Sequence, residues 1–204
     1  MTRSRESRAL ILDAAERLFA ERGFDATPTA AIAGSAGVPK GLLFYYFPSK
    51  TDLLRALVGE RLELDPIDIT ALIARGDPAR ALLNVSRVLR RLQEESAVRR
   101  VIVWREQRTH PEVHASLRDY RRQLQSLVEQ VLRASILHPI AAHRLRAAAT
   151  AWVAIIMTPT LHDHIAPDAP APPELAEAPA DAADAADLPT LADLISAGLQ
   201  DPAA

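Results

Sequence analysis

Four side chains that can donate hydrogen bonds to phosphate lie within eleven residues of the sequence. They are the ammonium groups of Lys40 and Lys50 and the hydroxyls of Tyr45 and Tyr46. Lys40 and Lys50 are also the two lysines of the chain. Donors of these types bind the phosphates of a nucleic acid and fix its position without reading its sequence. A general preference for arginine over lysine explains the lysine distribution equally well.

The aromatic residues of this segment have two interpretations. Phe44, Tyr45 and Tyr46 are consecutive, and buried core aromatics are the simpler reading of such residues. On a helix, however, three consecutive side chains cannot all face inward. We therefore expect at least one of them to be exposed, and we favour a nucleic-acid role for this face.

Other patterns that could carry chemistry are weak. Of the six histidines, His110 and His114 are four residues apart, but Pro111 lies between them, and His162 and His164 fall on opposite sides of a helix. We expect no metal site and no cofactor. The chain has no cysteine, and it contains none of the Gly-x-Ser-x-Gly, P-loop, Gly-x-Gly-x-x-Gly and His-Glu-x-x-His motifs. We therefore expect that it is not an enzyme.

Composition predicts an all-α fold. The 204 residues, 49% of them apolar and 25% charged, suffice for one or two globular domains. Seven glycines and 4% aromatic residues argue against a β-sandwich. The longest apolar stretch, from Ala147 to Met157, is shorter than the ~20 residues of a membrane span. The N-terminus lacks the apolar core of a signal peptide, so we expect a cytoplasmic protein.

Charge is unevenly distributed along the chain. Residues 1–61 carry a net charge of +2, residues 62–165 carry +4 and residues 166–204 carry −8. The overall charge of −2 therefore combines a mildly basic body with an acidic tail. Such a balance does not exclude nucleic acid as a partner.

The first fifty residues contain start and stop signals for three helices. An apolar stripe from Leu10 to Phe19 predicts a helix that ends at Arg22-Gly23. Thr27-Pro28 has the pattern of an N-cap followed by a helix over 28–35, and Pro39 predicts the start of a third helix that Phe47-Pro48 ends. Between them, Ala36-Gly37-Val38 predicts a tight turn. The residues expected to face inward are Ile32, Val38, Leu43 and Phe47.

Longer helices are expected in the rest of the chain. Ser49 to Asp52 is a capping box that starts a fourth helix, which runs to about Leu64 and is the continuous link between the two regions of the chain. Further helices are expected after Asp77-Pro78, around 98–110, after Pro111, and from Pro139 through Trp152 toward Pro159. Residues 166–189 hold six prolines and ten alanines, which predicts a mobile loop before a final short helix over Leu191–Leu199.

Three short helices with an Ala-Gly-Val turn between the second and third predict a helix-turn-helix. Here the sequence resembles the TetR family of bacterial transcriptional repressors. The matching segments are ILDAAERLFAERGF (11–24), Ile32-Ala33, Ala36-Gly37-Val38 and KGLLFYYFPSK (40–50). The resemblance covers residues 8 to about 58. It implies a three-helix DNA-binding domain over 1–50 and a helical effector-binding and dimerisation domain over 51–204.

The resemblance also implies which residues contact DNA. Thr27 and Pro28 occupy the positions at which the second helix approaches the DNA backbone. The third helix begins at Pro39, and its major-groove face carries Lys40, Gly41, Leu42 and Phe44, while Tyr45, Tyr46 and Lys50 occupy phosphate-contacting positions. Ala30 and Ala31 replace an arginine and an acid that are common in the family, so base reading is expected to rest on Lys40 and Leu42. Arg3, Arg5 and Arg8 form either a basic arm along the adjacent groove or a disordered terminus.

The implied function is a DNA-binding regulator, expected to be a repressor. Its partners would be a pseudo-palindromic double-stranded operator, a second copy of the chain and a small, mostly apolar effector, with no membrane. Candidate effector-binding residues among the later helices are Trp104, Arg105, Arg108, Tyr120, Trp152 and Ile156, although each tryptophan alone is better explained as part of the core. Two alternatives stay open: a helical ligand-binding or adaptor protein without DNA activity, and an unrecognised helical-bundle enzyme.

Overall fold

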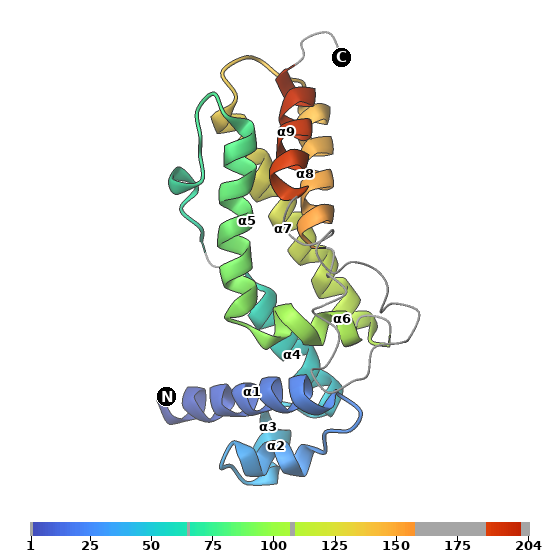
Figure 1. Cartoon of the computed structure of the whole chain (residues 1–204). Helices are drawn as coiled ribbons and strands as arrows, with labels where there is room; N and C mark the ends of the chain where they lie inside the picture. Colours follow the sequence, from blue (N-terminus) through green and yellow to red (C-terminus); the bar gives the residue numbers. More distant parts are fainter. Residues whose placement is uncertain (1, 65, 107–108, 158–186, 201–204) are drawn as a thin grey trace, which may run out of the picture. The chain divides into compact units, whose positions relative to one another are not determined.

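The computed structural model describes residues 2–64, 66–106, 109–157 and 187–200 (Figure 1). Regular structure in these ranges is entirely helical, which confirms the expected fold class. The helices in chain order are α1 (Thr2–Arg22), α2 (Thr29–Ser35), α3 (Lys40–Tyr46), α4 (Lys50–Leu62), the 3₁₀ turn η1 (Ile69–Ala71), α5 (Pro78–Glu94), the π-helix η2 (Val98–Ile102), α6 (Val103–Glu106), α7 (Pro111–Ser135), α8 (Ala142–Ile156) and α9 (Asp187–Gln200). No described helix has the length and apolarity that a bilayer span requires.

The chain packs as two units. The first contains residues 1–65 and 91–120, and the second contains residues 66–90 and 121–204. Helix α5 therefore starts in the second unit and ends in the first, and α7 runs the other way. The expected division after residue 50 concerns function, and it stays a prediction.

Helix α1 buries the apolar stripe that predicted it. Ile11, Ala15, Leu18 and Phe19 are at most 5% exposed. Gly23 ends the helix with a φ of 81°, a conformation that glycine adopts without a steric penalty, and its N–H donates to the Phe19 carbonyl at 2.9 Å. The helix starts earlier than the stripe indicates, at Thr2.

Of the three N-terminal arginines, Arg8 differs from the expectation of a basic arm or a disordered terminus. Arg8 is helical, and its guanidinium forms an ion pair with Glu60 of α4 and lies over the Phe47 ring, 5.2 Å from its centroid. The hydrogen bond from Arg8 holds the pKa of the Glu60 carboxyl below its ordinary value. The ion pair with Glu60 therefore joins α1 to α4, and it neutralises the charge of Arg8 within the unit.

Helices α2 and α3 form the expected helix-turn-helix. Gly37 has a φ of 66°, and the Val38 N–H donates to the Ala33 carbonyl at 3.0 Å, which closes the turn. Ile32, Leu43 and Phe47 are buried as predicted, whereas Val38 is only half-buried. Both prolines expected at the first helical position stand instead at the N-cap, with ψ near 140°. Such a shift of one residue at a helix start is common.

Helix α4 begins with the predicted cap. The Ser49 hydroxyl accepts from the Asp52 N–H at 3.0 Å and donates to an Asp52 carboxylate oxygen at 2.7 Å. This hydroxyl contact lowers the pKa of the Asp52 carboxyl. The buried side of α4 carries Leu53, Leu54, Leu57, Val58 and Leu62.

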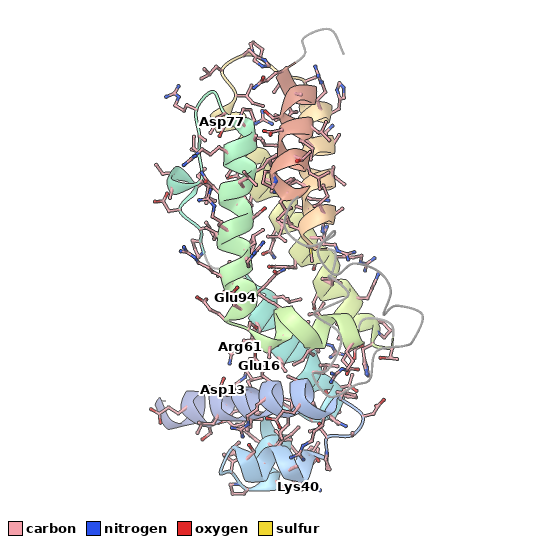
Figure 2. The ribbon with its side chains drawn as sticks, viewed as in Figure 1. Asp13, Glu16, Lys40, Arg61, Asp77 and Glu94 are labelled. Atoms are coloured by element: carbon pink, nitrogen blue, oxygen red, sulfur yellow. The ribbon has the colours of Figure 1, made fainter. Side chains whose placement is uncertain are left out.

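Residues 91–106 pack against α1 and α4 in the first unit. Glu16 of α1 accepts hydrogen bonds at one carboxylate oxygen from the Ser96 hydroxyl at 3.2 Å and from the Val98 N–H at 3.3 Å. Its other oxygen lies 3.2 Å from Nε of Arg61, which also pairs with Asp13. Figure 2 shows Asp13, Glu16 and Arg61 gathered on one side of α1. These charged groups join three segments that are far apart in the sequence.

The second unit has a core built from α5, α7 and α8, with α9 packed on α8 (Figure 1). Trp152 of α8 is fully buried, and its indole N–H donates to the Leu82 carbonyl of α5 at 3.2 Å. Along α7, the predicted stripe is buried at Val113, Leu117, Tyr120, Leu124 and Val131, while Leu127 is half-buried. The expected mobile loop over 166–189 lies outside the described residues except at 187–189, which belong to α9 and are helical.

Replacement of Trp152 by Phe is expected to destabilise the protein. The change removes the donor to the Leu82 carbonyl and leaves part of the indole volume empty, so the free energy of unfolding should fall by about 1–3 kcal/mol. Thermal and urea unfolding measure the loss. Arg87→Lys, at an exposed position of α5, serves as the control and should leave the melting temperature unchanged. A wild-type melting temperature for Trp152→Phe would contradict this role of the indole.

Candidate nucleic-acid interface

Helix α3 presents one face to its own unit and the other to solvent. Leu43 is fully buried, whereas Lys40, Gly41, Phe44 and Tyr45 are exposed, Tyr45 by 77%. Figure 2 shows the labelled Lys40 on the side of the first unit opposite to Glu16 and Arg61. The expectation that at least one of the three consecutive aromatic residues is exposed is therefore confirmed.

Aromatic contacts order the exposed face of α3. The Tyr45 and Tyr46 rings meet edge to face, with centroids 5.2 Å apart, and Tyr46 contacts the buried Phe47 ring at 6.4 Å. The Lys40 ammonium lies 5.7 Å from the centroid of the Phe44 ring, within the range of a cation–π contact. This face therefore presents a cation and a phenol hydroxyl on a support of packed rings.

The N-terminal ends of α2 and α3 are exposed next to this face. Pro28 and Pro39 are both exposed at the N-caps, and their carbonyls accept from the N–H groups of Ala31 at 3.0 Å and Leu42 at 2.9 Å. Leu42 itself is half-buried. The structure thus brings the prolines and the α3 residues predicted as contacts onto the same small subdomain.

Lys50 has contacts that its sequence position did not reveal. Its ammonium donates to the Asp25 carbonyl at 3.3 Å and lies 4.4 Å from the centroid of the Phe24 ring. An ammonium group has three N–H donors, so these contacts leave donors for a phosphate. The side chain is half-buried, and the turn between α1 and α2 fixes its direction.

Among the predicted DNA contacts, Thr27 differs from the prediction, because its side chain is buried. It is fully buried, and its hydroxyl donates to the Gly23 carbonyl at 2.7 Å and contacts the Leu18 carbonyl at 3.2 Å. It is also not the N-cap of α2, which is Pro28 and has no side-chain cap. The Gly23 carbonyl, just past the last residue of α1, accepts this hydroxyl within the turn. Thr27 therefore stabilises the turn, and its side chain has no surface to offer to DNA.

The candidate effector-binding residues fall in both units. In the first, Arg105 is exposed and donates to the Phe19 and Ala20 carbonyls at 3.3 Å, while burial raises the pKa of the Tyr120 hydroxyl. In the second, Trp152 is part of the core, and Ile156 is half-buried. The side chains of Trp104 and Arg108 lie outside the described residues. The effector site stays a prediction, and Arg105 gains a second role as a cap of α1.

Two carboxylates that sequence reasoning missed hold the first unit together. Glu16 is described above, and Glu106 is 6% exposed and accepts from the Phe24 N–H at 3.1 Å. A buried charge needs such partners. Local pattern gives no signal for either one, because their hydrogen-bond donors lie 80 residues or more away.

Asp13, Glu16, Arg17 and Glu94 also line an open crevice of about 430 Å³ in this unit.

No group of three or more metal-ligating side chains is found among the residues that the structure describes. The Glu106 and Glu112 carboxylates instead face the two ring nitrogens of His110 at 3.6 and 3.5 Å. His110 precedes α7, as the intervening proline predicted, so it shares no helical face with His114.

Comparison with known proteins identifies the N-terminal region. Residues 11–57 match the family model described as bacterial regulatory proteins, tetR family. The transcriptional regulator TtgR of Pseudomonas putida is 44% identical over 55 residues, which cover 27% of this chain and 26% of TtgR. The chain thus aligns with about a quarter of the length of the first curated relatives that it matches.

Two solved structures extend the likeness beyond this region. A mutant of HlyIIR has a TM-score of 0.61 at 17% identity and covers 98% of this chain and 100% of its own, which shows a shared fold. NalD, the secondary repressor of the MexAB-OprM multidrug efflux pump in Pseudomonas aeruginosa, is 26% identical with a TM-score of 0.53, over 76% of this chain and 82% of its own. The matched family consists of transcriptional regulators, which are not enzymes.

The structural role of Thr27 can be tested with two substitutions. Thr27→Val keeps the shape and removes the hydroxyl, so the Gly23 carbonyl loses this buried donor and the free energy of unfolding should fall by about 1–3 kcal/mol. Thr27→Ser keeps the hydroxyl and should lose much less. Urea unfolding distinguishes the two variants. Equal stabilities for Val and Ser at this position would show that the hydroxyl does not hold the turn.

Proposed function

We propose that the chain is a transcriptional repressor that binds its operator through α3, since residues 11–57 match the model of the tetR family of bacterial regulatory proteins. The supporting observation is the exposed face of α3, which carries Lys40 and Tyr45 while the opposite face is buried. A helix supported in this way can enter a major groove without unfolding its own core. This proposal places the chain in the cytoplasm, where a bacterial operator lies.

The contacts divide by chemistry. Tyr45, Tyr46 and Lys50 are proposed to bind phosphates, and the backbone at Pro28 and Pro39 approaches the same strand. Lys40 and Leu42 are proposed to read bases, the ammonium at acceptors of guanine and the isobutyl group at thymine methyls. Gly41 and Phe44 complete this face. Thr27 is omitted because its hydroxyl is buried.

An operator selected from random duplexes tests the function directly. Enrichment of a pseudo-palindrome, bound in a mobility-shift assay far more tightly than unselected duplexes, is the expected result. If no sequence is enriched and binding is equally weak to all duplexes, the chain is not an operator-binding protein. The alternative of a helical ligand-binding or adaptor protein would then replace this proposal.

Lys40→Ala should weaken operator binding and reduce its dependence on salt. Loss of one ammonium at the DNA lowers the slope of log K against log salt by about one, because about one fewer counterion is released. Mobility shifts at several salt concentrations measure both quantities. Arg87→Ala, which removes one exposed charge from the second unit, is the control and should leave the slope unchanged. A wild-type slope for Lys40→Ala would remove Lys40 from the interface.

We also propose a two-fold dimer formed through α8 and α9. Helix α8 leaves Ala147, Ala151 and Ala154 exposed at helical spacing, and Leu194 of α9 is 65% exposed. Small residues on one helix and a leucine on its neighbour form a surface on which a second pair of helices can pack. Packing of the apolar segment from Ala147 to Met157 in this interface is part of the same proposal.

Leu194→Glu should shift the protein from dimer to monomer. A charge at the centre of an apolar interface has to be desolvated without a partner, which is strongly unfavourable. Sedimentation at micromolar concentration measures the change. Leu137→Glu, at another exposed leucine of the second unit outside α8 and α9, is the matched control and should remain dimeric. A wild-type protein that sediments as a monomer would overturn the dimer itself.

Release from the operator is proposed to follow the binding of a small, mostly apolar effector among the helices after α4. An effector changes operator affinity only through its different affinities for the two states of the protein. A thermal-shift screen against apolar compounds, followed by mobility shifts with each hit, tests the idea. Hits that stabilise the protein and leave operator affinity unchanged would contradict it.

A further inference from the structure

Phe24 contacts four different parts of the first unit. Its ring lies 5.3 Å from the Phe19 ring of α1 and 4.4 Å, edge to face, from the His110 ring. The Lys50 ammonium, at the start of α4, lies 4.4 Å from the centroid of the same ring. The Phe24 N–H donates to Glu106 of α6 at 3.1 Å. One residue in the turn after α1 thus connects α6 with a cation proposed to bind phosphate.

Burial and contacts with His110 fix the position of Glu106, and this position sets the geometry of its hydrogen bond to the Phe24 N–H. The residue is 6% exposed, and its carbonyl accepts from the His110 N–H at 3.0 Å. Its second carboxylate oxygen faces His110 Nε2 at 3.6 Å. Breaking the bond would leave a buried N–H and a buried charge without partners, which is costly.

Gly23 and Arg105, the neighbours of Phe24 and Glu106, contribute to the same contact between the end of α1 and α6. Gly23 adopts a φ of 81°, and a Cβ at this position would lie 3.6 Å from Nη1 of Arg105 and 4.0 Å from the Glu106 carboxylate. Arg105 itself donates to the Phe19 and Ala20 carbonyls at the end of α1. Adjacent side chains of α6 therefore bind both the last turn of α1 and the residue that follows it.

We infer that Glu106 is a positioning residue for operator binding: through Phe24 it sets the place of the Lys50 ammonium. The inference rests on the proposed function. The Phe24 ring supports one side of the ammonium and the Asp25 carbonyl accepts one of its protons, so the remaining donors point in a direction that the turn defines. Loss of the Glu106 bond removes the anchor of the Phe24 main chain, so the ring that supports the Lys50 ammonium is no longer held in this position, although Thr27 still closes the turn.

The test compares two substitutions of the same residue. Glutamine keeps a carbonyl oxygen that accepts from the Phe24 N–H, whereas alanine removes the acceptor. Glu106→Ala should therefore weaken binding to the selected operator several-fold and lower the salt slope by about one, as Lys50→Ala does. Glu106→Gln should stay near the wild type. Glu112→Ala, which removes the carboxylate on the other side of His110, is the matched control for the loss of a partner of that ring.

The double variant Glu106→Ala/Lys50→Ala decides whether the two residues act together. It should bind operator no more weakly than Lys50→Ala alone, because the ammonium that Glu106 positions is already absent. Independent, additive losses in the double variant would overturn the inference. A wild-type salt slope in Glu106→Ala would do the same.

A measurement without DNA separates this inference from the proposed function. In NMR spectra, the ring current of Phe24 should displace the side-chain signals of Lys50, and this displacement should persist in Glu106→Gln and vanish in Glu106→Ala. Unchanged Lys50 signals in a folded Glu106→Ala protein would refute the positioning role, whatever the operator experiments give. If Glu106→Ala does not fold, Phe24→Leu replaces it, because leucine retains the N–H bond and removes the ring. That variant should lose the salt-slope contribution of Lys50, and a wild-type slope would overturn the inference.

Discussion

Burial of α1 on two sides is the constraint on which the first unit depends. One side is apolar and covers α2, α3 and α4 through residues such as Ile11 and Phe19. The other is polar, and there Glu16 accepts hydrogen bonds from residues 96–98 and pairs with Arg61. Hydrophobic burial supplies most of the free energy, whereas the carboxylate fixes the register, because it is satisfied in only one arrangement. The helix-turn-helix is thus attached to a helix whose position is determined from both sides.

Four arginines described in the first unit join its elements to one another. Arg8 and Arg61 pair with carboxylates between α1 and α4, and Arg105 caps α1. Arg99 donates to the Glu63 carbonyl at 2.9 Å and to the Leu92 carbonyl at 3.3 Å, where α4 and α5 end. A positive charge at a helix C-terminus is favourable. Net charge is therefore a poor guide to the interface of this protein, since the donors available on α3 and beside it are lysines and tyrosines.

The sequence predicted what depends on near neighbours. Gly23, Gly37 and Ser49 each determine a turn or cap within four residues. The bounds of α1 to α4 therefore agree with the prediction to within a residue or two, apart from the earlier start of α1. The same reasoning failed where a side chain binds a distant partner. Thr27 has the pattern of an N-cap, but the free carbonyls at the end of α1 are its actual acceptors. The bond between Phe24 and Glu106 spans 82 residues and leaves no periodic signal.

The π-helix at Val98–Ile102 has a further consequence. A π turn holds one residue more than an α turn, and such turns are rare in stable helices. If it tightened to α geometry, the surplus residue would pass to the next turn, and every side chain beyond it would rotate by about 100° around the helix axis. Glu106 lies four residues past Ile102, so this rotation would move its carboxylate away from the Phe24 N–H. The hydrogen bond between Phe24 and Glu106 therefore depends on the π turn that precedes Glu106.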